Sequence, residues 1–234
     1  TDSPTTGPGL TRRQVVAAGA GALALAPLYA AYQQSTRTPV DIGLPSVAAF
    51  AERAPPLAPP GVLEDLKQRS FRFFWETTDA RTGLAPDRWP ARSFASIAAV
   101  GFALTAYPVG VARGWITREQ ARDRALSTLR FFHDAPQGPE ATGVAGYKGF
   151  FYHFLDMASG TRSGDCELST IDTALLLAGA LHVQSFFDGA DEQETQIRTI
   201  ADERYARVDW TWAQLPSGLI ARGWQPEKGF IGHQ

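Results

Sequence analysis

The chain has 234 residues, of which 44% are hydrophobic and 11% are aromatic, so it can bury a large core and is neither disordered nor fibrous. Its formal net charge is −2 and its basic residues are dispersed, which gives no reason to expect a nucleic-acid partner. The single cysteine, Cys166, excludes an internal disulfide and is expected to be a small packed residue.

The first part of the chain has the form of a twin-arginine export signal. Arg12 and Arg13 precede a short, weakly apolar run that ends at Pro27, and this run is well below the roughly 20 residues that a membrane-spanning helix needs. We therefore expect a signal peptide over residues 1–31. The protein would be a bacterial periplasmic or secreted protein, exported by the twin-arginine translocation machinery.

A proline-rich linker is expected over residues 32–60, because closely spaced prolines rule out long regular elements. The predicted domain occupies residues 61–234. Its first helix carries an apolar stripe opposite charged residues; the stripe consists of Val62, Leu63, Leu66, Phe73 and Phe74. A second helix, from about Phe94 to Tyr107, is apolar on every face, and a connection from Pro108 to Ile116 follows it.

Two capping boxes mark the amphipathic helices that follow. Thr117 with Gln120 opens a third helix, and Asp191 with Glu194 opens a fifth. Between them lies a fourth helix with no charged residue from Thr173 to Phe187. Apolar and amphipathic helices thus alternate, which predicts an all-α fold with two concentric layers and the apolar helices inside.

The long connections of the predicted domain all lead from an outer helix to an inner one. They span residues 81–92, 133–169 and 209–232, and we expect them to gather on one rim, where short β-hairpins form and the site lies. Four carboxylates on this rim are candidate catalytic groups: Glu167, Asp172, Asp156 and Glu227.

Glycoside hydrolysis requires two carboxyl groups roughly 5 to 10 Å apart, one to protonate the leaving oxygen and one to activate water or attack the sugar. Asp172 could equally complement a helix dipole, and Asp156 is more simply explained as holding the turn before Gly160. Glu167 and Glu227 have no such evident structural role. They are the stronger candidates.

Substrate-binding candidates flank these carboxylates, because aromatic rings stack on sugars and polar side chains bond to hydroxyl groups. They are Asp87, Arg88, Trp89, Tyr147, Lys148, His153, Arg162 and Trp224. Core packing is the alternative for the aromatic residues. The histidines lack metal-ligand spacing, and no phosphate-binding loop or serine nucleophile motif occurs, so we expect no metal and no cofactor.

Five separate runs, in the expected order, resemble the bacterial glucoamylase-like domain family. They are residues 71–75, 96–102, 146–157, 167–174 and 223–230. The resemblance implies an (α/α)6 toroid and an activity like that of endo-β-1,2-glucanases. It also implies seven helices beyond the five found here, so we expect this chain to cover about the first half of the toroid.

These observations together predict a glycoside hydrolase that acts on a glucan, most simply a β-1,2-glucan, by carboxylate acid and base catalysis. Two alternatives stay open. One is a carbohydrate-binding or scaffold protein that lacks a complete acid and base pair. The other is a polysaccharide lyase, which would need a basic cleft, whereas these loops are more acidic than basic.

Overall fold

The computed structural model describes residues 61–231, so the predicted signal peptide and linker lie outside the described residues. The helices are α4 (Val62–Thr77), α5 (Ile97–Ala112), α6 (Arg118–Asp134), α7 (Thr170–Phe186) and α8 (Glu192–Arg207). The strands are β1 (Ala95–Ser96), β2 (Gly146–Tyr147), β3 (Phe150–Tyr152), β4 (Phe154–Leu155), β5 (Leu168–Ser169), β6 (Gly223–Gln225) and β7 (Gly229–Ile231). The expectation of a helical domain with short strands in its loops is confirmed for these residues.

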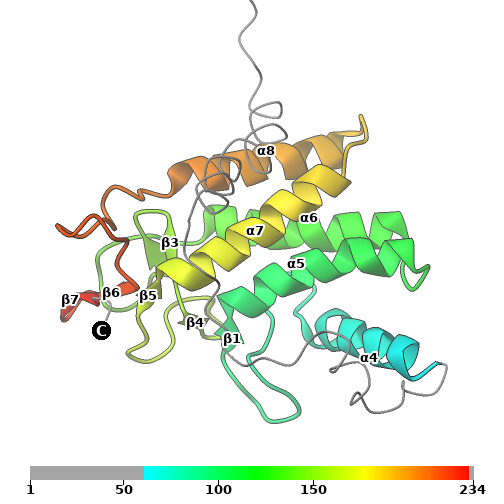
Figure 1. The fold of residues 1–234 in the computed structure, drawn as a ribbon, viewed down its shortest axis with the longest axis horizontal. Coiled ribbons are helices and arrows are strands. Elements are labelled where there is room, and N and C mark those ends of the chain that lie inside the picture. Colours follow the sequence, from blue (N-terminus) through cyan, green and yellow to red (C-terminus); the bar gives the residue numbers. More distant parts are fainter. Residues whose placement is uncertain (1–60, 232–234) are drawn as a thin grey trace, which may run out of the picture. The chain divides into compact units, whose positions relative to one another are not determined.

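The two apolar helices, α5 and α7, lie side by side (Figure 1). Glycines at the crossing let their backbones touch: a Cβ on Gly179 would lie 2.3 Å from the carbonyl oxygen of Gly101, and a Cβ on Gly101 would lie 2.3 Å from that of Leu175. No side chain fits into such a gap. This pair of helices is the inner layer that the sequence predicts.

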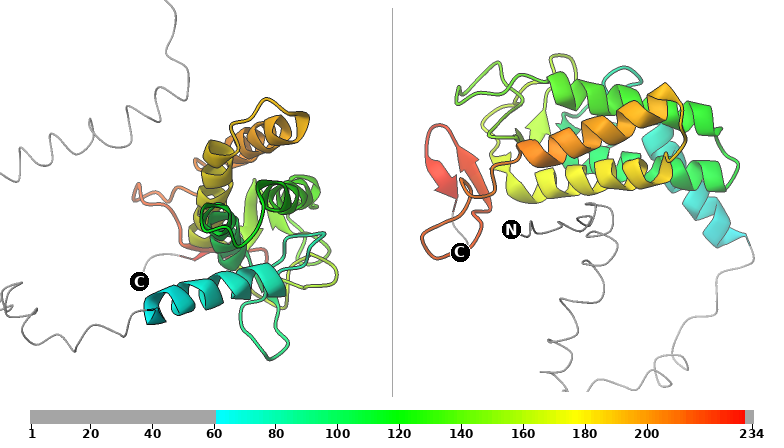
Figure 2. Two further views of the ribbon diagram at one scale, coloured as in Figure 1. Left: turned by 90° about the vertical axis from the view of Figure 1, so that its right-hand side faces the viewer. Right: turned by 90° about the horizontal axis from the view of Figure 1, so that it is seen from above.

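The amphipathic helices flank this pair (Figure 2). Helix α8 packs on α7 and on α6, while α6 and α4 both pack on α5. Their buried faces supply much of the core, including Phe71 of α4, Leu129 and Phe132 of α6, and Ile197 of α8. The described helices thus form an inner and an outer layer, as the alternation predicts. They do not themselves close a ring.

One face of the inner pair is left uncovered within the described part of the chain. Phe102 and Val109 of α5 and Ile171 and Leu175 of α7 are exposed. Large apolar side chains that lie together on a surface mark a place where further protein or a ligand packs. An uncovered apolar face on α5 and α7 is compatible with the expectation that this chain covers only part of a toroid.

Outer helices end and inner helices begin at the same end of the domain, where all the strands lie (Figure 1). The strands form a two-stranded sheet, β1 with β4, and a five-stranded antiparallel sheet in the order β2, β3, β5, β6, β7. Strands β1 and β5 each run directly into an inner helix. The predicted gathering of the long loops on one rim is confirmed.

Two predicted details of the helices are wrong. Helix α5 does not stop before Pro108 but continues to Ala112, because a proline removes only its own N–H bond and the carbonyls beyond it are satisfied. Val109 and Gly110, for example, accept bonds from Arg113 at 3.0 Å and Trp115 at 2.9 Å. Pro108 itself is buried inside the helix.

The second error concerns α8. The Asp191 side chain accepts a hydrogen bond from the Glu194 N–H, but the reciprocal bond of a capping box, from the Asp191 N–H to the Glu194 side chain, is replaced. The Glu194 carboxylate is buried and forms two bonds to Arg118 of α6, at 2.7 and 2.8 Å, and a third to the Gly189 N–H. A bidentate pair with a guanidinium is stronger than the single bond from a backbone N–H that the capping box would supply. Chiefly through Arg118, the pKa of Glu194 is held below its usual range.

The predicted stripe of α4 is also only partly buried. Val62, Leu63 and Leu66 are exposed, whereas Phe71 is buried and its ring lies 5.2 Å from that of Trp115. The helix is anchored through its second half, which periodicity alone does not reveal. Among the described helices none has the length and hydropathy needed to cross a bilayer.

Candidate active site

The junction of β5 and α7 is the point at which the rim converges. Strand β5 pairs with β3 on one side and with β6 on the other, so segments more than 50 residues apart meet on it. The Ser169 hydroxyl accepts a hydrogen bond from the Asp172 N–H at 3.1 Å and donates one to the Asp172 carboxylate. The serine therefore caps α7 and fixes the Asp172 side chain.

His153 lies between two carboxylates at this junction. Its Nδ1 is 3.0 Å from Glu167 Oε1, and its Nε2 is 3.7 Å from Asp172 Oδ1. The three side chains are 30%, 33% and 15% exposed respectively, so the cluster is only partly accessible to solvent. Partly enclosed, interacting titratable groups of this kind are typical of sites that transfer protons.

A row of stacked rings supports the imidazole. The His153 ring lies 3.9 Å from that of Phe154 at an interplanar angle of 20°, and the Phe154 ring lies 4.0 Å from that of Phe94. The Arg88 guanidinium sits 5.8 Å from the centre of the Phe94 ring, and Arg88 also pairs with Asp87 at 3.3 Å. Asp87 and Arg88 thus lie at the far end of the row that begins at His153.

The strand register separates the predicted aromatic residues from this cluster. Successive residues of a strand point to opposite faces, and β5 pairs Leu168 with Trp224 and Ser169 with Gly223. His153, Glu167 and Ser169 therefore share one face of the sheet, and Trp224 lies on the other. Trp224 and Tyr147 contact each other and Trp212, with ring centres 5.4 to 5.6 Å apart.

Glu227, a predicted catalytic residue, forms a bidentate ion pair with Arg162 at 2.6 and 3.2 Å. The guanidinium lowers the pKa of Glu227, so this carboxylate is poorly suited to donate a proton near neutral pH. The Arg162 side chain is 1% exposed and also bonds to the carbonyls of Ala141 and Cys166. The prediction that Arg162 binds substrate conflicts with this burial, and a structural role explains both residues.

Asp156 holds a turn, as the simpler explanation of its sequence position expects. Its carboxylate accepts bonds from the Ala158 and Ser159 N–H groups and from the Ser159 hydroxyl, at 2.8 to 3.0 Å. These bonds lower the pKa of Asp156. Of the four candidate carboxylates, only Glu167 and Asp172 are brought together at His153.

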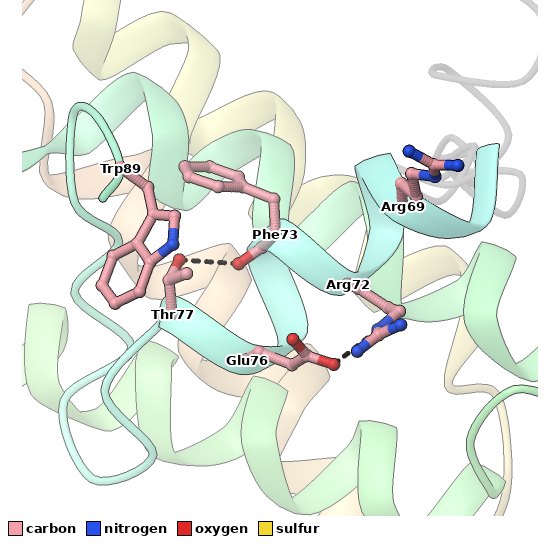
Figure 3. Close-up of a pocket in the computed structure, with 6 residues that line it drawn as sticks. All are labelled: Arg69, Arg72, Phe73, Glu76, Thr77 and Trp89. Atoms are coloured by element: carbon pink, nitrogen blue, oxygen red, sulfur yellow. Dashed lines mark hydrogen bonds and ion pairs between the residues drawn. The ribbon is translucent and has the colours of Figure 1, made fainter. Parts of the chain in front are cut away.

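Trp89 lies elsewhere on the rim, against α4 (Figure 3). It is 66% exposed and lines a pocket of about 250 Å³ together with Phe73, Arg69, Arg72, Glu76 and Thr77. None of the residues of the His153 cluster lines this pocket. Lys148 is at the tip of the hairpin between β2 and β3, where its ammonium lies 3.5 Å from Asp209.

Phe94 belongs to the row of rings behind His153, and no spacing pattern in the sequence links it to the site. His153 itself was expected only as a substrate ligand. Side chains alternate in direction along β3 and the residue after it, so His153 points to the same face of the sheet as Ser169. This could be inferred only once the pairing of β3 with β5 was known. No group of three or more His, Cys, Asp or Glu residues able to hold a metal ion occurs within the described range.

The described helices lie in two layers, and a cluster of carboxylates around a histidine lies at the N-terminus of α7. This arrangement is similar to that of known glycoside hydrolases. No protein-family model matches the chain. Over 184 residues, covering 75% of this chain, it is 26% identical to an exo β-1,2-glucooligosaccharide sophorohydrolase (non-reducing end) of Parabacteroides distasonis strain ATCC 8503.

Solved structures show the same relationship. A glucoamylase-like protein of Bacteroides uniformis ATCC 8492 superimposes with a TM-score of 0.64 at 25% identity, covering 75% of this chain and 42% of its own. A β-1,2-glucanase of Parabacteroides distasonis superimposes with a TM-score of 0.63 at 27% identity, covering 71% of this chain and 24% of its own. The predicted resemblance to glucoamylase-like proteins is confirmed.

The chain spans only part of these relatives. It covers 24% of the sophorohydrolase and 42% of the Bacteroides protein. What the relatives hydrolyse is therefore a property of longer proteins.

Proposed function

We propose that this chain is part of a glycoside hydrolase that cleaves a β-1,2-linked glucan, and that it carries one wall of the active site. The observation that carries the proposal is the cluster of Glu167, His153 and Asp172 at the N-terminus of α7. The relatives named above, which include β-1,2-glucan hydrolases, support the same class of substrate.

We assign the proton-transfer role to Glu167. It is the more exposed of the two clustered carboxylates, and its hydrogen bond to His153 fixes the direction of its side chain. Asp172 is more enclosed and is held by Ser169, so we assign it the role of orienting His153. An acid and a base that are fixed before substrate arrives lower the cost of reaching the transition state.

The cluster also argues against a lyase. A lyase acting on uronic acids needs cationic groups to neutralise the substrate carboxylate, whereas two carboxylates flank His153 here. A neutral sugar that donates hydroxyl hydrogen bonds suits such a site better. The proposed substrate is accordingly an uncharged glucan.

The test is the turnover of β-1,2-gluco-oligosaccharides by the intact protein carrying Glu167→Gln, which keeps the shape of the side chain and removes its titrating proton. We expect kcat to fall by about 10²-fold or more at an unchanged melting temperature. Glu140→Gln is the matched control, because Glu140 is also an exposed glutamate in a rim loop. It should leave kcat unchanged.

Each other outcome has a definite meaning. A loss confined to substrate affinity, worth roughly 1 to 3 kcal/mol, would make Glu167 a hydrogen-bond partner of the sugar and not an acid or base. Wild-type turnover and affinity would remove Glu167 from the site. A parent protein that binds β-1,2-glucan without releasing product would be a carbohydrate-binding protein, and one that prefers another linkage would refute the substrate assignment.

The proposal extends to architecture and location. The exposed faces of α5 and α7 fit an (α/α)6 toroid of which the described helices form about half. Arg12 and Arg13, which precede a short apolar run, fit export to the periplasm or out of the cell. Size-exclusion chromatography with a hydrophobic dye tests the first point. A compact, non-binding monomer of residues 61–234 alone would contradict it.

A further inference from the structure

A second pocket opens on the strand-bearing end of the domain, between the C-termini of α6 and α8 and the hairpin of β2 and β3. Its volume is about 510 Å³, within the range that holds small organic ligands. Six side chains dominate its wall: His133, Gln137, Tyr147, Lys148, Arg204 and Arg207. No carboxylate from the described residues lines it.

Arg204 is the unusual member of this group. It is 3% exposed. Among residues 61–231 its guanidinium has one hydrogen bond, from Nη2 to the Gly149 carbonyl at 3.3 Å, and one ring contact, 4.9 Å from the centre of Phe151. Its Nε is buried, and no residue of that range supplies a hydrogen-bond partner for it. Within the described part of the chain no carboxylate lies within ion-pair distance of Arg204, although isolated buried charges are strongly unfavourable.

Burial and the neighbouring Arg207 cation lower the pKa of Arg204 to about 10. At neutral pH the side chain is therefore still charged. A buried cation that stays protonated beside a second cation raises the free energy of the folded state, unless something negative offsets it.

The other cations of the pocket are only partly neutralised. Arg207 bonds to the His133 carbonyl and to His133 Nε2, both at 3.0 Å, and has no acidic partner among the described residues. Lys148 lies 3.5 Å from Asp209, and His133 Nδ1 lies 3.5 Å from Glu203. Neither carboxylate lines the pocket, and the charged side chains that do line it are basic.

The pocket beside Trp89 provides an internal comparison (Figure 3). It is also lined by two arginines, but Arg69 pairs with Asp65 at 2.6 Å and Arg72 pairs with Glu76 at 2.6 Å. Both arginines of that pocket are therefore neutralised by carboxylates of α4. The pocket of Arg204 and Arg207 departs from that pattern.

We propose that the pocket lined by Arg204, Arg207 and Lys148 binds the anionic group, phosphate or carboxylate, of a small organic molecule. Arginine suits this role because its planar fork of N–H donors matches the oxygens of such groups. The pocket is larger than a free inorganic anion requires, and the Tyr147 ring forms part of its wall. A sugar carrying a phosphate fits both the charge and the ring.

Thermal melting of the intact protein with three probes tests the proposal: inorganic phosphate, glucose 6-phosphate and glucose. A ligand present at ten times its Kd should raise the melting temperature by about 3 to 6 °C. We expect a saturable rise with phosphate and with glucose 6-phosphate. Glucose reports any binding at the proposed glucan site, and a rise with glucose should be the same in the parent and in the pocket variants. If glucose 6-phosphate binds more tightly than inorganic phosphate, the ligand is an organic molecule that carries the anionic group. If the two bind equally, the ligand is a free anion.

The variants place the site. The double variant Arg207→Gln with Lys148→Gln, both outside the His153 cluster, should weaken phosphate binding by about 10-fold or more, and Arg204→Met should abolish the response. Arg69→Gln with Arg72→Gln is the matched control, and it should keep the parent's response. If Arg204→Met fails to fold, the double variant still decides the question.

Two results would overturn the proposal. One is the absence of any saturable phosphate or glucose 6-phosphate effect on the parent. The other is an equal response in the parent and in the Arg207→Gln, Lys148→Gln double variant. Because none of these measurements uses glucan hydrolysis, failure of the proposed function would leave the outcome unaffected.

Discussion

Replacing Gly179 by alanine sets two physical effects against each other. In a solvent-exposed helix interior, glycine to alanine stabilises a protein by roughly 0.5 to 1 kcal/mol, because alanine restricts the unfolded chain. Gly179 lies inside α7, so helix propensity alone predicts that Gly179→Ala is stabilising.

The structure predicts the opposite sign. A Cβ at Gly179 would lie 2.3 Å from the carbonyl oxygen of Gly101 and 2.8 Å from its Cα, whereas a carbon and a carbonyl oxygen need roughly 3.3 Å. Backbone atoms cannot rotate away, so α5 and α7 must separate by about 1 Å. Overpacking of a close core costs roughly 1 to 3 kcal/mol, and after subtraction of the propensity gain a net loss of up to about 2.5 kcal/mol remains.

Urea denaturation of the intact protein measures this difference as a lower transition midpoint at an unchanged slope. Ala178→Gly, at an exposed position beside it on the same helix, calibrates the propensity effect and should cost roughly 0.5 to 1 kcal/mol. A Gly179→Ala protein more stable than its parent would show that the backbones of α5 and α7 do not touch. Combining it with Gly101→Ala should cost less than the sum, because the two glycines relieve the same contact.

Three further outcomes are expected. Replacing Arg12 and Arg13 by lysine should leave the precursor in the cytoplasm, and export equal to the parent by cell fractionation would disprove the signal assignment. Arg162 lowers the pKa of Glu227 in the folded protein. Their pairing therefore stabilises the fold above the unfolded pKa of about 4.3, and this stabilisation is lost as the pH falls through the lower folded pKa. The stability difference between the parent and Glu227→Gln in urea melts should shrink below about pH 4, and a constant difference would contradict this. Trp89→Ala should change stability by less than about 0.5 kcal/mol, since the ring is exposed, and calorimetry with glucan oligosaccharides decides whether binding weakens.

Local patterns in the sequence were sufficient for the helices and for the rim. The capping box of Thr117 and Gln120 is present in full, as predicted, and Ser169 caps α7. These features depend on residues three or four positions apart, which the sequence displays directly. The alternation of apolar and amphipathic helices likewise follows from local composition.

The predictions that failed concern contacts between residues that are far apart in the sequence. Nothing near Glu194 in sequence reveals that Arg118, on another helix, takes its carboxylate. In the same way Glu227 had no visible partner until the fold brought Arg162 to it. Charged residues with no local explanation were interpreted as functional, although a distant ion pair explains one of the two.

The candidate site was predicted in part. Glu167 and Asp172 were selected with His153 nearby, and the structure brings these three together. Trp224 and Tyr147 were placed with them because they belong to the same loops. Only the register of β5 with β6 shows that Trp224 faces the other way.

Strand β5, only two residues long and paired on both sides, also determines where the chain tolerates a change in length. One residue inserted between Glu167 and Ser169 would turn Glu167 to the face occupied by Trp224 or lift the cap from α7, since neighbouring positions alternate in direction. The surface turns around Gly143 and Gly218 have open space about them. Insertions should therefore be accepted at these turns and rejected at the strand, which keeps the spacing from Glu167 to α7 constant.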